Sequence, residues 1–326
     1  GMSSVAHARV NEMDLAPVLE SEGVFDVCTA ADICGENNYG SIIKDDPLFA
    51  DGLVQYVGQP MFAVAATSVD AARKAARKAK VDYDELEAIL DPLTAVAKQA
   101  FVLPSETIVR GDPDAALEES PQRLQKRVEL GGQDQFYLEG QIAMAIPQED
   151  GGILVSSSTQ HPDEVQTIIA HATKRDAKDI VVVCRRMGGA FGGKESQAAL
   201  IGGIAALVAD KTGRPCKLRL DRDDDMIMTG KRHDFVIDYD VGFDDTGRIL
   251  GINFEFAARC GMSADLSGPV CDRAMFHCDN AYFLENVRIL SHRCKTNTVS
   301  NTAFRGFGGP QGMFAIEHAL DDIART

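Results

Sequence analysis

Two short glycine-rich stretches carry the residues best suited to ligand chemistry. Residues 187–195 have the sequence Met-Gly-Gly-Ala-Phe-Gly-Gly-Lys-Glu, and residues 303–311 have the sequence Ala-Phe-Arg-Gly-Phe-Gly-Gly-Pro-Gln. Each stretch places an aromatic residue among glycines, directly before a predicted helix. Glycine allows a ligand to approach the backbone closely, and the first turn of a helix offers free N–H groups to an anion. Two such loops predict a large ligand held between them.

The first loop comes close to the phosphate-binding pattern of nucleotide hydrolases. Gly188, Gly193 and Lys194 match G-x-x-x-x-G-K, but Glu195 stands where that loop needs a Ser or Thr hydroxyl for Mg²⁺. A carboxylate at this position would also repel phosphates, so nucleotide hydrolysis is disfavoured. A tight junction between helix and sheet without any ligand would explain one such loop, but it explains two poorly.

Several stretches together resemble the molybdenum-binding subunits of xanthine dehydrogenases, in the xanthine dehydrogenase/aldehyde oxidase family of molybdenum hydroxylases. Any single glycine loop would be weak support, whereas the combination is specific. The matching residues are 57–60, 131–139, 158–160, 191–195, 272–277 and 295–311.

The resemblance implies an α+β fold with two family domains. Residues 1–92 would form an α/β hammerhead domain, with its first strands missing. Weak periodicity and several Pro and Gly residues predict a linker with short structured pieces at residues 93–124. Residues 125–326 would be the first molybdopterin-binding domain, truncated at its C-terminal end. The chain would then be a fragment of a longer protein.

The same resemblance implies the reaction and its cofactors. A molybdenum–molybdopterin cofactor would oxidise hypoxanthine and xanthine to urate, with water as the source of oxygen. Electrons would leave through iron–sulfur clusters and FAD to NAD. The iron–sulfur clusters and the FAD would belong to a partner subunit or domain, so a hetero-oligomer with an Fe-S/FAD-containing small subunit is expected.

Cofactor-contacting residues follow from the resemblance position by position. It places Gln160 beside the oxygen ligands of the metal, Phe191 and Gly192 at the flanks of the molybdenum, and Arg305 on the cofactor side of the site. It implies no side chain that ligates the metal directly.

Substrate-contacting residues follow in the same way. Glu195 would hydrogen-bond the purine ring, Arg273 would stabilise negative charge that develops on it, and Phe307 would pack against it. A fixed guanidinium aimed at developing charge lowers a barrier, and a carboxylate accepts from a ring N–H. Each residue also has a plain alternative: Glu195 as a helix-dipole partner, Arg273 as a surface ion pair and Phe307 as a core side chain.

Three departures from the family pattern bear on these expectations. Ala190 replaces a usual glycine, which matters little if its φ is negative. Gln135 stands where His is common, which we interpret as a surface or second-layer difference. The Gly-Glu-Pro-Pro stretch that carries the catalytic glutamate does not occur, so the general base is absent and the fragment alone is expected to be inactive and without cofactor.

Two alternatives remain open. The chain could belong to a related molybdenum hydroxylase that acts on aldehydes or other N-heterocycles. It could also be a truncated, non-catalytic interaction or assembly module. The length of the native reading frame separates the enzyme from the module.

Composition limits the possible partners. The 326 residues, 45% of them hydrophobic, suffice for about two domains. A net charge of −16 disfavours nucleic acid. No membrane-spanning run and no leader are evident, which predicts a cytoplasmic protein. The eight cysteines form no C-x-x-C pair, so reduced thiols are expected rather than a metal cluster or a disulfide framework.

Hydrophobic periodicity predicts the elements that position the loops. We expect strands at residues 24–28, 61–66, 81–83 and 180–184, and hairpins at residues 143–158 and 235–256. Helices are expected at residues 69–80, from Pro162, at residues 196–212 and at residues 310–326. Residues 32–51 are predicted to be a polar loop.

Overall fold

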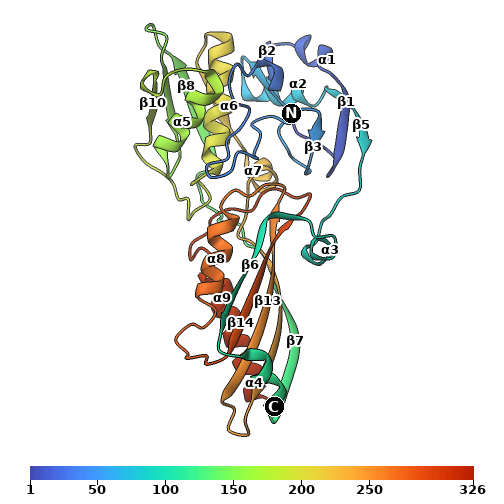
Figure 1. The fold of residues 1–326 in the computed structure, drawn as a ribbon. Helices are drawn as coiled ribbons and strands as arrows, with labels where there is room; N and C mark the ends of the chain where they lie inside the picture. Colours follow the sequence, from blue (N-terminus) through green and yellow to red (C-terminus); the bar gives the residue numbers. More distant parts are fainter. The chain divides into compact units, whose positions relative to one another are not determined.

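The computed structural model describes all 326 residues, which form two compact units (Figure 1). The first unit comprises residues 1–88, 135–230 and 297–300, and the second comprises residues 89–134, 231–296 and 301–326. Each unit is therefore built from segments that are distant in the chain. The fold is α+β, as predicted, with separate sheets covered by helices.

The N-terminal part of the first unit holds two small sheets, with strand orders β3-β1-β5 and β2-β4. Ser68 caps helix α2 by accepting a hydrogen bond from the Ala71 N–H, and α2 packs on β4. The predicted sequence of strand, helix and strand is present, although β4 and β5 pair in different sheets. The elements are β1 (Ala8–Asp14), α1 (Ala16–Leu19), β2 (Val24–Thr29), the 3₁₀ helix η1 (Ala30–Asp32), β3 (Leu53–Val54), β4 (Phe62–Ala66), α2 (Val69–Ala76) and β5 (Lys80–Glu85).

A four-stranded sheet of order β10-β9-β8-β11 forms the rest of the first unit, with α5 and α6 packed on it. The predicted hairpin of β8 and β9 is confirmed, and β10 returns parallel to β9 after α5. Helix α6 is buried along most of its length and ends at Gly213, whose φ is 63°. The elements are β8 (Ile142–Pro147), β9 (Ile153–Ser157), α5 (Pro162–Thr173), the 3₁₀ helix η2 (Ala177–Asp179), β10 (Ile180–Val183), α6 (Gln197–Thr212), β11 (Cys216–Arg219) and α7 (Arg222–Met228).

A five-stranded sheet of order β6-β14-β13-β12-β7 organises the second unit. The predicted hairpin of β12 and β13 is confirmed, with Phe235 opposite Ala258, and β13 continues well beyond the expected end. The elements are α3 (Pro92–Ala97), β6 (Phe101–Arg110), α4 (Pro113–Glu119), β7 (Gln122–Leu130), β12 (Phe235–Phe243), β13 (Ile249–Gly261), α8 (Ser267–Phe276), β14 (Val287–Lys295) and α9 (Gly309–Ala324).

The two faces of this sheet carry different helices (Figure 1). Alternate residues of β12 and β13, such as Ile237 and Phe256, form one core with α8 and α9. The intervening residues, such as Ala257, face α3. Helices α8 and α9 approach closely, because a Cβ at Gly312 would lie 2.1 Å from the carbonyl oxygen of Ala274. This close contact fixes the helix that carries Arg273.

Three parts of the structure differ from the sequence-based expectation. Residues 93–124, expected to be a linker with short structured pieces, hold helix α4 and the ten-residue strand β6, which pairs with β14 as an edge strand of the sheet. Pro104 and the weak periodicity of this stretch concealed a strand that is only partly buried. The loop at residues 32–51 contributes Tyr39, Leu48 and Phe49 to the core. Helix α8 was not predicted. The family-domain boundaries at residues 92 and 125 remain predictions.

The helices of the structure are all too short or too polar to cross a bilayer. All eight cysteines are present as free thiols, and five of them are buried. Burial raises the pKa of Cys28 to about 12 and that of Cys216 to about 11. Such thiols carry little thiolate at neutral pH and are poor nucleophiles.

Candidate functional site

The first glycine loop has a strained backbone at its aromatic residue. Phe191 adopts a φ of 57° and Gly192 a φ of 104°, both in the left-handed region. A bulky residue in this region costs about 1–3 kcal/mol and persists only where its surroundings enforce it. The loop packs closely on Gln135, because a Cβ at Gly193 would lie 2.8 Å from Cδ of that residue. Ala190 is absent from the residues with positive φ, so its methyl group is tolerated as expected.

Gln160 is fixed against this loop by its own amide oxygen. Its Oε1 accepts hydrogen bonds from the Gly192 N–H at 2.9 Å and from the Lys194 N–H at 3.4 Å. Its backbone N–H donates to the carbonyl oxygen of Lys194 at 2.9 Å. The side-chain Nε2 makes no hydrogen bond within the protein, so Gln160 presents a positioned amide donor to a ligand at the loop.

Lys194 points away from any ligand and into the protein. Its side chain is fully buried, and Nζ donates to the carbonyl oxygen of Glu139 at 2.7 Å and to Oγ of Ser158 at 2.8 Å. Nζ also lies 4.6 Å from the centre of the Tyr137 ring. Burial lowers the pKa of Lys194. This position gives a second reason to reject a nucleotide-binding loop, whose lysine must reach the phosphates.

Replacing Lys194 with Met should therefore lower the free energy of unfolding by about 2–4 kcal/mol, because a buried carbonyl and a buried hydroxyl lose their donor. Chemical denaturation of the two proteins measures this difference. Lys178→Met is the matched control: Lys178 is exposed and pairs only with exposed Asp176, so its loss should stay within about 0.5 kcal/mol. Equal effects of the two substitutions would contradict a structural role for Lys194.

Glu195 is a half-buried carboxyl group directly before α6. Burial raises its pKa above the usual range, while the nearby imidazole of His161 opposes that shift. Its carboxylate makes no hydrogen bond or ion pair within the protein, and it lies outside the first turn of α6. The alternative role as a helix-dipole partner is therefore weakened. A partly desolvated carboxyl without a protein partner is suited to a polar ligand.

The second glycine loop repeats this backbone pattern in the second unit. Gly306, Phe307 and Gly308 have φ values of 97°, 48° and 91°. Phe307 is half-buried, and its N–H donates to the carbonyl oxygen of Phe304 at 2.7 Å. Both loops thus hold a phenylalanine in a left-handed conformation directly before a glycine, and both lead into a 16-residue helix.

Arg273 lies on α8 beside the second loop, with its guanidinium exposed. A Cβ at Gly309 would lie 3.9 Å from its Nε, which donates to Nε2 of His277 at 3.3 Å. The neighbouring Asp272 pairs with Arg293 instead, and Arg273 has no carboxylate partner. The alternative of a surface ion pair therefore fails, and the guanidinium is available to a ligand.

Arg305 is exposed in the same loop. Its carbonyl oxygen accepts a hydrogen bond from Nη2 of Arg232 at 2.9 Å, which fixes the backbone at this residue. The structure thus gathers Arg273, Arg305 and Phe307 in the second unit. Gln160, Phe191, Gly192 and Glu195 are gathered in the first unit.

Gly308 of the second glycine loop packs closely against α8. A Cβ at this position would lie 2.0 Å from the carbonyl oxygen of Val270, and its φ of 91° disfavours any side chain. We expect Gly308→Ala to cost about 3 kcal/mol or more, since overpacking and left-handed strain add. Gly213→Ala, where φ is 63° and the space is open, should cost only about 1–2 kcal/mol. Denaturation curves of the two variants compare these costs, and a Gly308→Ala cost no larger than that of Gly213→Ala would contradict the close contact.

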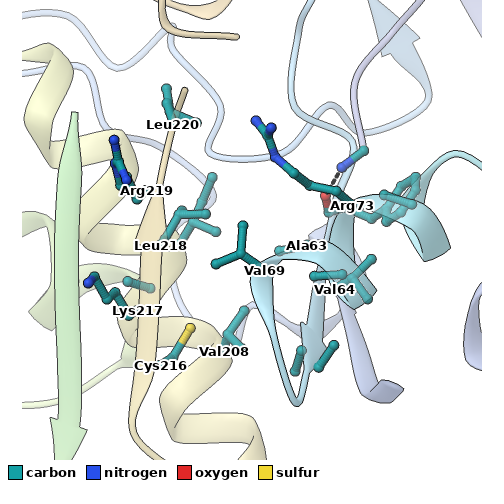
Figure 2. Close-up of a pocket in the computed structure, with 18 of the residues that line it drawn as sticks. Ala63, Val64, Val69, Arg73, Val208, Cys216, Lys217, Leu218, Arg219 and Leu220 are labelled. Atoms are coloured by element: carbon teal, nitrogen blue, oxygen red, sulfur yellow. Dashed lines mark hydrogen bonds between the residues drawn. The ribbon is translucent and has the colours of Figure 1, made fainter. Parts of the chain in front are cut away.

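An apolar cavity of about 280 Å³ lies elsewhere in the first unit (Figure 2). Ala63 and Val64 of β4 and Val69 of α2 face Val208 of α6 and Leu218 of β11 across it. The predicted site residues of the first unit do not line this cavity. It is therefore separate from the candidate site.

The residues of the first loop fit the cofactor that the sequence implies. The free Nε2 of Gln160 is a donor for an oxygen ligand. Gly192 has no side chain, so a ligand can approach the backbone of the loop closely at this residue. The structure contains no group of three His, Cys, Asp or Glu residues with metal-binding geometry. Of the two interpretations of Gln135, the structure excludes the surface one: only 5% of this residue is exposed, and its side chain lies behind Gly193 in a second layer.

Sequence reasoning missed two buried cations, Lys194 and Arg232, because their burial depends on contacts distant in the chain. Arg232 donates from Nε to Oε1 of Gln133 and from Nη2 to Arg305. The single clue in the sequence is that both are basic residues close to strongly apolar segments.

Comparison with known proteins agrees with this architecture. Residues 1–87 match the model of the aldehyde oxidase and xanthine dehydrogenase a/b hammerhead domain, and residues 96–326 match the molybdopterin cofactor-binding domain. The chain is 41% identical over 324 residues to the xanthine dehydrogenase/oxidase of Gallus gallus and 40% identical over 325 residues to that of Mus musculus. The matched region makes up 99% of this chain and 24% of the length of each relative.

Among solved structures, the aldehyde oxidoreductase of Desulfovibrio gigas superposes with a TM-score of 0.89 at 26% identity, over 99% of this chain and 38% of that one. The fold is thus that of a molybdenum hydroxylase. The chain belongs to the xanthine dehydrogenase and aldehyde oxidase family, and it spans about a quarter of the length of the curated relatives named here.

Proposed function

We propose that this chain is part of a molybdenum hydroxylase that oxidises purines, converting hypoxanthine and xanthine to urate with water as the source of oxygen. Electrons leave through iron–sulfur clusters and FAD to NAD. The observation that carries the proposal is Glu195, a half-buried carboxyl with a raised pKa and no protein partner beside the first glycine loop. A purine offers ring N–H groups to such a carboxyl.

Cofactor contacts are assigned to residues with free donors or an open backbone. Gln160 donates from Nε2 to an oxygen of the cofactor, Phe191 and Gly192 border the metal, and Arg305 contacts the cofactor side. When bound, the molybdenum cofactor supplies the redox chemistry of the hydroxylation. The N–H groups of Gly192 and Lys194 donate to Oε1 of Gln160 and hold this side chain in place.

Substrate contacts are assigned to Glu195, Arg273 and Phe307. Glu195 accepts a hydrogen bond from the ring, Phe307 packs against its plane, and Arg273 stabilises negative charge that develops during nucleophilic attack on the ring carbon. The absence of a carboxylate partner leaves the full charge of Arg273 available. None of these groups serves as the general base, which we assign to a part of the protein outside this chain.

The remaining components are assigned to partners. An Fe-S/FAD-containing small subunit or domain accepts the electrons, the native enzyme is a cytoplasmic hetero-oligomer, and this segment by itself is inactive. The chain spans 24% of the length of a relative named xanthine dehydrogenase/oxidase, which supports placing the other redox components outside these residues.

Aldehyde oxidation is the second candidate, favoured by the structural similarity to an aldehyde oxidoreductase. The two functions differ in what Glu195 can bind, because a small aldehyde has no ring N–H. Steady-state kinetics of the full-length enzyme with xanthine, a neutral N-heterocycle and a small aldehyde test the choice. The proposal expects the highest kcat/KM for xanthine, and a higher value for the aldehyde would overturn it.

A non-catalytic module remains the candidate from another class. The native reading frame separates the two: several hundred further residues with Gly-Glu-Pro-Pro support the enzyme. A stop codon near Thr326 supports the module.

A further inference from the structure

Arg232 is a buried guanidinium without a counter-ion. Only 8% of its surface is exposed, and no carboxylate lies within ion-pair distance. Arg293, the other buried arginine, pairs with Asp272, and the half-buried Arg259 and Arg175 pair with Asp234 and Asp210. A buried charge without a partner is costly, so its presence calls for an explanation from ligand binding.

The donors of Arg232 are only partly used within the protein. Nε donates to Oε1 of Gln133 at 2.7 Å, and Nη2 donates to the carbonyl oxygen of Arg305 at 2.9 Å. The guanidinium also stacks 4.0 Å from the centre of the Phe304 ring. Nη1 is buried and has no hydrogen-bond acceptor. A guanidinium cannot lose its proton to avoid this cost, so Nη1 needs an acceptor.

The unused donor faces the second glycine loop. A Cβ built at Gly306 would lie 4.0 Å from Nη1, and Gly306 has a φ of 97°. The 16-residue helix α9 begins at Gly309, so the positive end of its dipole is close to the same loop. Oε1 of Gln311, in the first turn of α9, is a second buried polar atom without a partner. The charged donor and the helix end both favour a negative ligand.

We propose that Arg232 is an anion-binding residue of the second glycine loop, and that its Nη1 donates a hydrogen bond to an anionic oxygen of a ligand held at residues 304–309. The ligand identity rests on the proposed function, which offers two sources of the same chemistry. One is the phosphate of the molybdopterin cofactor, and the other is an anionic purine substrate.

The test uses the full-length protein with Arg232→Gln, which removes the charge, and Arg259→Gln as the matched control. Arg259 lies in the same unit but donates from Nε to Oδ1 of Asp234 at 2.8 Å. Three quantities are measured: molybdenum per purified chain, KM for xanthine and for a neutral aldehyde, and the thermal midpoint of cofactor-free protein with and without inorganic phosphate. Cofactor-free protein comes from a host that cannot make molybdopterin.

We expect Arg232→Gln to lower molybdenum occupancy about tenfold if the anion belongs to the cofactor, as for the loss of one charge-assisted hydrogen bond. If the anion is the substrate, occupancy stays and KM rises about tenfold for xanthine but not for the aldehyde. In either case phosphate stabilises the cofactor-free wild type and not the variant, and the variant's midpoint without phosphate is not lowered. Arg259→Gln lowers that midpoint but keeps the occupancy per folded chain.

Unchanged occupancy and unchanged KM values in Arg232→Gln would overturn the proposal. So would a cofactor-free variant that is destabilised as much as Arg259→Gln, because Arg232 would then serve only to hold Gln133 and Arg305. Failure of the proposed function is distinguishable, since it would appear in the wild type as missing molybdenum or missing xanthine turnover. The phosphate titration would still decide the role of Arg232 in that event.

Discussion

Arg273→Met in the full-length enzyme should lower kcat for xanthine by about 10²–10³-fold, the usual effect of removing one donor that stabilises transition-state charge. KM should change less, because the interaction strengthens only as negative charge develops on the ring. Arg273 can exert this effect because Asp272 pairs with Arg293 and leaves the Arg273 guanidinium free. Steady-state kinetics measure both parameters.

Arg288→Met is the control for this experiment. Arg288 lies on β14 and pairs with Asp114, so its loss should leave kcat within about twofold of the wild type. If Arg273→Met left kcat intact, Arg273 would be an ordinary surface residue, and the purine assignment would rest on Glu195 alone.

Glu195→Ala should reduce kcat/KM for xanthine by about 10²-fold or more while sparing a small aldehyde, which has no ring N–H for the carboxylate to accept. Without this carboxylate, a ring N–H of the bound purine loses its acceptor. Parallel assays of the two substrates measure the selectivity. The exposed Glu118 of α4 is the control, and Glu118→Ala should leave both substrates unaffected.

The pH dependence of the Glu195 variants adds an independent readout. Burial raises the pKa of Glu195, so its carboxylate form is lost at a higher pH than that of an ordinary glutamate. Purine kcat/KM should therefore fall on the acidic side as pH drops through this raised pKa, and Glu195→Gln should lack that fall. Equal losses for purine and aldehyde in Glu195→Ala would mean that Glu195 holds the loop and not the substrate.

Elements with strong local patterns could be predicted from the sequence. The apolar stripe after Pro162 and the apolar run closed by Gly213 gave helices α5 and α6 nearly to the residue. The alternating residues before Asp244 gave the hairpin of β12 and β13. In each case the local preference and the final packing agree.

Elements whose structure depends on distant partners could not be predicted in this way. β6 is half exposed and contains Pro104, and its pairing with β14 joins residues at least 177 positions apart, the separation of Arg110 and Val287. Helix α8 has mixed polarity and becomes a core helix only through its close contact with α9. Sequence patterns carry little information about such pairings.

The candidate site shows the same division. The two glycine loops and the helices that follow them were evident from the local sequence alone. The free Nε2 of Gln160 and the missing partner of Arg273 were not evident, because each depends on which atoms neighbouring side chains already use. For the same reason the sequence left open whether Gln135 lies at the surface or in a second layer, since nothing in its local sequence indicates burial under Gly193.

We propose that the full-length protein oxidises a purine with oxygen taken from water. The most direct measurement follows xanthine turnover in water enriched in oxygen-18, with mass spectrometry of the urate formed. Over many turnovers we expect one oxygen atom derived from the labelled water in each urate. Urate that carries no label from water, or the absence of urate from a molybdenum-loaded enzyme, would contradict it.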